Sequence, residues 1–141
     1  MRALILAIIV MASSSATIRL SSFNAHAIVD QQIRYTVVGG RFTPPRSIDL
    51  TSQDVTLFVA GARGFRSLLS AGSFRETGLG GYVARVTDNS FKTDILLQPF
   101  ICGDWAYSAA IEGFVPGSTS VTVSLAIGGQ VGEATVMAYL F

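Results

Sequence analysis

Apolar and polar side chains alternate with a period of two residues through most of the chain after residue 32. In the first such segment, Ile33, Tyr35 and Val37 alternate with Arg34 and Thr36, and we expect the first three to face the core. Successive side chains of a β-strand point to opposite faces, so this pattern buries one face and leaves the other in water. The pattern recurs, with residue types that favour strands, at 55–59, 82–87, 91–97, 105–112 and 121–127, and less cleanly at 133–141. The sequence therefore predicts an all-β protein.

Glycine and proline residues mark the breaks between these segments. They lie at 39–40, 44–45, 61, 64, 78, 80–81, 103, 116–117 and 128–129, and both residue types favour turns. Because the connections are short, neighbouring strands should pair as antiparallel hairpins. About seven to nine short strands in roughly 100 residues are typical of an antiparallel β-sandwich. A small closed β-barrel is the alternative.

The first residues have the three parts of an export signal. A positive start, Met1 and Arg2, precedes an uncharged apolar run at 3–12 and a small polar stretch at 13–16. A membrane-spanning helix needs about 20 apolar residues, so this run is too short for an anchor and predicts a signal-peptide helix. Two cleavage sites compete, after Ala16 and after Ala27. We expect a signal peptide at 1–27, one β-sandwich domain at 28–141, and a secreted or periplasmic protein.

Several chemistries lack the residues that they need. Ten basic and nine acidic residues give a net charge of +1, which gives no reason to expect nucleic acid as a partner. Nucleotide binding has no support because no G-x-x-x-x-G-K phosphate loop is present. Cleavage after Ala27 would remove His26, the only histidine, and with it histidine-based triads and histidine-ligated metal sites. The sequence thus predicts no cofactor, no metal site and no enzyme.

The only cysteine, Cys102, has no disulfide partner within the chain. We expect a free thiol, and we expect it to be buried, because unpaired cysteines are among the most buried residue types. The alternative is a bond to another molecule in an oxidising compartment.

The nine carboxylates are spread singly along the chain. A glycosidase needs two that face each other about 5 to 10 Å apart, and the sequence brings no two together. A carboxylate-dependent hydrolase is therefore only an alternative. Residues 88–90, Asp-Asn-Ser, contain oxygen atoms that suit calcium but lack the dense acidic spacing of a calcium loop, and we interpret them as a turn.

Trp105 and Tyr107 lie two residues apart on one predicted strand and so share a face. Such a pair can form a flat platform for sugar rings, which makes these two the candidate ligand-binding residues of a carbohydrate-binding module. The same face carries Ala109 and Ile111, which favours a core position for both rings. Four phenylalanines on polar faces or in turns would mark a contact patch if they were exposed together: Phe58, Phe65, Phe100 and Phe114.

The segment 136–141 is apolar and finishes in Phe141. A terminal aromatic residue on a last strand resembles outer-membrane β-barrel proteins. The smallest such barrels need about eight strands of about 9 to 11 residues, and several strands predicted here are shorter. We therefore prefer an edge strand that closes a sandwich, or an exposed strand that pairs with another copy of the chain.

Four short segments, at 48–50, 54–57, 70–74 and 121–128, resemble β-rich parts of uncharacterised secreted bacterial proteins. The resemblance covers 48–136 and implies a secreted β-sandwich module with no known activity. We expect this module to act without catalysis, by surface contact, through self-association or by binding envelope or extracellular glycan or protein. A carbohydrate-binding module, a small outer-membrane β-barrel and a carboxylate-dependent hydrolase are the alternatives, and no membrane contact is expected after signal removal.

Overall fold

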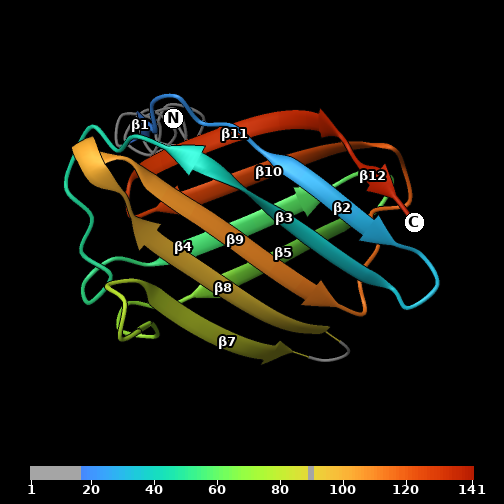
Figure 1. Cartoon of the computed structure of the whole chain (residues 1–141), viewed down its shortest axis with the longest axis horizontal. Coiled ribbons are helices and arrows are strands. Elements are labelled where there is room, and N and C mark those ends of the chain that lie inside the picture. Colours follow the sequence, from blue (N-terminus) through green and yellow to red (C-terminus); the bar gives the residue numbers. More distant parts are fainter. Residues whose placement is uncertain (1–16, 89–90) are drawn as a thin grey trace, which may run out of the picture.

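The chain folds into two β-sheets that pack face to face (Figure 1). The computed structural model describes residues 17–88 and 91–141. The predicted signal-peptide segment 1–16, and residues 89–90 of the predicted turn, lie outside the described residues. In the described part of the chain the two sheets remain separate and do not close into a barrel. The predicted antiparallel β-sandwich is thus confirmed.

The order of the strands decides which residues share a layer. The five-stranded sheet runs through β1 (Ile18–Arg19), β11 (Gln130–Met137), β10 (Ser120–Ile127), β4 (Val55–Ala60) and β5 (Gly64–Leu69). The seven-stranded sheet runs through β12 (Tyr139–Leu140), β2 (His26–Asp30), β3 (Tyr35–Phe42), β9 (Trp105–Glu112), β8 (Phe91–Pro99), β7 (Tyr82–Asp88) and β6 (Arg75–Glu76). Nine of the described strands have five residues or more, in line with the sequence pattern, and the short strands β1, β6 and β12 lie at sheet edges.

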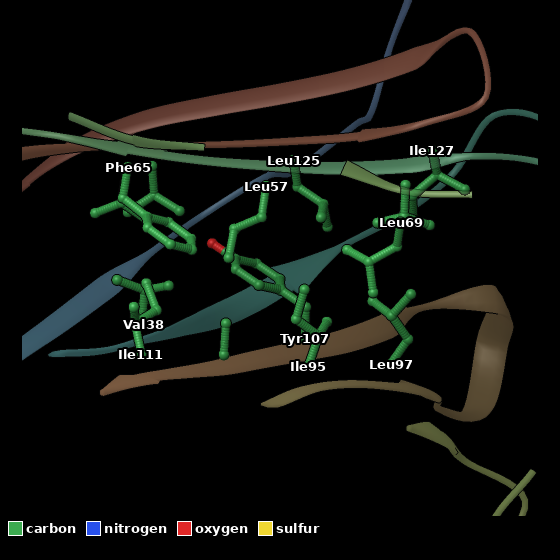
Figure 2. Packing of buried hydrophobic residues seen from close by; sticks show 14 of the residues in the cluster. Val38, Leu57, Phe65, Leu69, Ile95, Leu97, Tyr107, Ile111, Leu125 and Ile127 are labelled. Carbon is green, nitrogen blue, oxygen red and sulfur yellow. The ribbon is translucent and has the colours of Figure 1, made fainter. Parts of the chain in front are cut away.

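The hydrophobic core lies between the sheets and contains the alternate side chains of the sequence pattern (Figure 2). Leu57 of β4 is the register partner of Leu125 of β10, and both are buried. Ile95 of β8 and Ile111 of β9 are buried in the facing sheet. Burial of one such side chain stabilises the folded state by roughly 2 kcal/mol. Because most of the long strands bury one face, the period-two pattern correctly indicates strands that pack against one core.

Strand β3 buries different residues from those that the alternation indicated. Thr36 and Val38 are fully buried, whereas Ile33 lies in the preceding turn with 69% of its surface exposed. The Thr36 hydroxyl donates a 2.6 Å hydrogen bond to the main-chain oxygen of Phe114, which satisfies this polar group inside the core. A slip of one residue moves every side chain to the other face, so the predicted register of this strand was wrong.

Gly39 and Gly40 lie inside β3 and not in the turn that the sequence predicted. A side chain at Gly40 would collide with the main-chain oxygen of Asn24. A Cβ atom at Gly39 would lie only 2.9 Å from the main-chain oxygen of Tyr107. The two glycines therefore permit the close approach of a neighbouring backbone. The sequence does not distinguish a glycine needed for this reason from a glycine needed in a turn.

Residues 17–25 are integrated into the sandwich. β1 pairs with β11, and Leu20 is buried. The Phe23 ring stacks on Tyr107 with 5.2 Å between the ring centroids. β2 then begins at His26, so this histidine is part of the folded domain. The folded domain thus includes residues 17–27 in addition to the expected 28–141.

Candidate contact surfaces

The predicted Trp105–Tyr107 platform is not a shared exposed surface. Tyr107 is 4% exposed, and its hydroxyl donates a 2.8 Å hydrogen bond to the main-chain oxygen of Asn24. Burial raises the pKa of the Tyr107 hydroxyl well above its usual range. Trp105 is half-buried and stacks on Tyr82 with 6.1 Å between the ring centroids. Both rings lie on the face of β9 that is turned toward the core, so a sugar ring has no access to the face of Tyr107.

Cys102 is exposed, which contradicts the expected buried thiol. It lies in the short 3-10 segment η1 (Ile101–Gly103) between β8 and β9, with a φ angle of 63°. This tight connection lies beyond the end of both strands, so its side chains have no opposite sheet to pack against. The preference of cysteine for the core was thus overridden by its place in a turn.

The four singled-out phenylalanines do not form one patch. Phe65 and Phe114 are buried and pack against each other with 5.5 Å between their ring centroids, so neither can belong to an exposed patch. Phe58 and Phe100 are partly exposed, but Phe58 belongs to β4 of the five-stranded sheet and Phe100 follows β8 of the other sheet. The sequence placed Phe65 beside Gly64 and therefore in a turn, whereas it is an inward residue of β5.

The described carboxylates are dispersed. Within residues 17–88 and 91–141, no three histidine, cysteine or acidic side chains are grouped in a way that could hold a metal ion. Two of the hollows on the described surface have volumes of about 530 Å³ and about 120 Å³, and each is lined by one carboxylate, Glu133 in the larger and Asp88 in the smaller. Neither hollow offers the facing pair of acids that glycoside hydrolysis requires.

Large apolar side chains are exposed together at the C-terminal side of the sandwich. Tyr139 is 72% exposed and Phe141 is 78% exposed, and Met137 and Leu140 are exposed beside them. β12 adds to the seven-stranded sheet by pairing in parallel with β2, and the main-chain N–H of Phe141 donates to Val29. We call these four side chains the C-terminal patch. β12, which follows β11 and leads to the C-terminus, lies at the right of Figure 1.

Strand β11 leads to the C-terminal patch along an edge that is paired over only part of its length. β1 pairs with Gln130 and Val131, so residues 132–137 are hydrogen-bonded to one strand in the described structure, β10, while β2 of the other sheet also contacts β11. The larger hollow lies at the start of this stretch. Its lining combines residues of the N-terminal segment and of β11: Thr17, Arg19, Leu20, Ser22, Phe23, Val131, Gly132 and Glu133.

Sequence reasoning missed the N-terminal half of this hollow. Arg19, Leu20 and Phe23 were included in the expected signal peptide at 1–27, and only the apolar segment 136–141 was singled out on this side. Gly132 was a usable signal, because a glycine inside a strand often marks a close approach of another segment. Here the Phe23 ring packs directly against Gly132 and leaves no room for a side chain.

No protein-family model, curated protein or solved structure matches the chain. Among residues 17–88 and 91–141, no helix has the length and apolarity that crossing a bilayer would require.

Proposed function

We propose that this protein is an exported, non-enzymatic β-sandwich module that acts by surface contact, through association with a second copy along β11 and the C-terminal patch. The observation that carries the proposal is the exposure of Met137, Tyr139, Leu140 and Phe141 within five consecutive positions. Contiguous exposed apolar side chains on a folded domain mark contact sites. Transfer of such a side chain from water to an interface contributes roughly 1.5–3 kcal/mol.

The free side of β11 supports a second copy as the occupant. Residues 132–137 have no ladder partner on the side away from β10 in the described structure, although β2 contacts β11, and unpaired strand edges associate with other strands. Two copies related by a two-fold axis can place their β11 edges antiparallel, so that each supplies the strand that the other lacks. Arg19 and Glu133 line the same hollow beside this edge and provide opposite charges for contacts between copies.

Export belongs to the same proposal, with processing after Ala16. Cleavage after Ala27 would remove β1, the buried Leu20 and the Phe23 ring that stacks on Tyr107. Cleavage after Ala16 leaves every described strand in place. Mass spectrometry of the exported protein tests this boundary: Thr17 is the expected first residue, and Ile28 as the first residue would contradict it.

The test of self-association is light scattering after size exclusion on the mature protein purified without detergent. We expect a concentration-dependent dimer. The double variant Tyr139→Ser/Phe141→Ser should raise the dissociation constant about a hundredfold, because two apolar side chains no longer contribute. The matched control is Leu79→Ser/Ile101→Ser, which removes two apolar side chains that are 89% and 86% exposed in loops elsewhere.

Each outcome of this test has a defined meaning. A dimer that is lost in the patch variant and kept in the control supports the proposal. A monomer at every concentration overturns it. Equal loss of association in both double variants also overturns it, because that result indicates non-specific apolar contact and not a defined edge.

A further inference from the structure

A second surface, independent of the proposed edge, lies on the outer face of the seven-stranded sheet, which is turned toward the viewer in Figure 1. His26, Gly39, Ser108 and Leu96 are register partners in one row across β2, β3, β9 and β8. The adjacent row contains Arg41, Ala106 and Gln98. Their sequence neighbours Ala27, Val38, Tyr107 and Leu97 are buried, so these two rows point away from the core.

The guanidinium of Arg41 is held over an aromatic ring and makes no ion pair among the described residues, and the diagonal carboxylate of Asp104 accepts a 2.7 Å hydrogen bond from the Thr43 hydroxyl. Its central carbon lies 4.4 Å from the centroid of the Phe100 ring, within range of a cation–π contact. The Arg41 main-chain N–H donates a 2.9 Å hydrogen bond to the side-chain oxygen of Asn24. In the part of the chain that the structure describes, the single ion pair is that of Arg85 with Asp94. The N–H donors of Arg41 therefore have no carboxylate within ion-pair distance there.

The imidazole of His26 lies over Gly39, its register partner in the row next to that of Arg41. A Cβ atom at Gly39 would be 3.1 Å from Cε1 and 3.2 Å from Nε2 of His26, so the absence of a side chain at Gly39 makes room for the ring. Gly39 is the register partner of His26, and Arg41 follows two residues later on β3. Diagonal neighbours of this kind are about 7–8 Å apart across a strand pair. The imidazole and the guanidinium are therefore within reach of one small ligand.

The outward side chains of β9, which lie between these groups and β8, are small. Ala106 and Ser108 supply a methyl group and a hydroxyl group on β9, and both residues are half-buried. The half-buried Gln98 follows on β8, in register with Ala106. Small side chains let a flat ligand approach the sheet, while the hydroxyl and amide groups at its border can pair with sugar hydroxyls.

We propose that this surface, formed by His26, Arg41, Gln98, Phe100 and Ser108, binds a carboxylate-bearing sugar of an acidic glycan. A guanidinium pairs with a carboxylate through two parallel hydrogen bonds, which a neutral sugar cannot offer. The exposed parts of the Phe100 and His26 rings supply apolar contacts for the faces of sugar rings. Trp105 and Tyr107, which the sequence singled out for this role, face inward and take no part in it.

Calorimetric titration of the mature protein with a short oligogalacturonate tests the proposal. We expect saturable binding, weaker by about tenfold or more in Arg41→Gln, because the charge-assisted pair with the carboxylate is lost. Phe100→Ser should weaken binding in the same direction. The matched control is Arg66→Gln, since Arg66 is exposed on the outer face of the other sheet as the register partner of the partly exposed Phe58. We expect this control to bind like the wild type.

Two further ligands separate the proposed chemistry from simpler ones. A neutral galactose oligomer of the same length should bind at least tenfold more weakly, because it lacks the carboxylates. Inorganic phosphate should not compete at equal concentration, because it has charge but no sugar ring. Absence of oligogalacturonate binding, equal loss in Arg41→Gln and Arg66→Gln, or full competition by phosphate would each overturn the proposal. Thermal unfolding of every variant verifies that it is folded.

Discussion

The hydroxyl of Tyr107 donates a 2.8 Å hydrogen bond to the main-chain oxygen of Asn24, which lies 83 positions earlier in the chain. This bond ties β9 to the segment that leads from β1 to β2. The side-chain oxygen of Asn24 in turn accepts the main-chain N–H of Arg41 at 2.9 Å. The N-terminal segment is therefore fastened both to the core and to the strand that carries the proposed sugar-binding arginine.

Replacement of Tyr107 tests how much this bond contributes. We expect Tyr107→Phe to lower the free energy of unfolding by about 1 kcal/mol, because the ring packing stays while the Asn24 oxygen loses its partner. Urea denaturation measures the change. Tyr139→Phe is the control, since Tyr139 is mostly exposed, and it should leave stability unchanged. Equal stability of Tyr107→Phe and the wild type would contradict the prediction.

The same residue predicts how stability depends on alkaline pH. Burial raises the pKa of the Tyr107 hydroxyl in the folded state, whereas an unfolded chain releases this proton near pH 10. This contribution is fully present below about pH 10 and is lost as the pH rises toward the folded-state pKa, because the unfolded state releases its proton first. Urea midpoints should decline above about pH 10, and Tyr107→Phe should decline less steeply than Tyr139→Phe.

The length of the folded domain can be tested with two chains that differ at their start. A chain that begins at Thr17 keeps β1, the buried Leu20 and the Phe23–Tyr107 stack, and a chain that begins at Ile28 loses them. We expect the shorter chain to unfold at a lower urea concentration or to be insoluble. Within the longer chain, Phe23→Ala should lower the free energy of unfolding by about 2–3 kcal/mol. Equal stability of the two chains would show that residues 17–27 are dispensable.

The role of Gly40 in allowing close approach of a neighbouring backbone can be tested by alanine substitutions in two strands. Gly40→Ala would place a methyl group against the main-chain oxygen of Asn24, and we expect it to lower the free energy of unfolding by about 2 kcal/mol or more. Gly64→Ala is the matched control, because the nearest atom to its added Cβ would be a Phe58 ring carbon at 3.8 Å. It should change stability by less than about 0.5 kcal/mol. A similar loss in both variants would refute the role assigned to Gly40.

The fold class could be predicted because one-sided burial leaves a local signature. The segments 55–59, 91–97 and 121–127 alternate clearly, and each buries the face that its pattern indicates. β5 escaped prediction because its inward face includes the polar Ser67 and its outward face includes the apolar Leu68, which obscures the alternation. β3 was predicted in the wrong register for a related reason: Thr36 is satisfied by the distant Phe114 carbonyl, a partner that periodicity cannot reveal.

The sequence by itself determined the strand-rich character of the chain, favoured a sandwich over a closed barrel, and determined the apolar character of residues 136–141, because these follow from residue type and spacing along the chain. Tertiary structure alone decided that Gly39 and Gly40 lie within a strand, that Cys102 is exposed, and that Tyr107 holds the N-terminal segment. It also decided that His26, Arg41 and Phe100 meet on one outer face. These outcomes depend on which strands become neighbours and how closely their backbones approach. Those are properties of contacts between distant residues, and local alternation does not encode them.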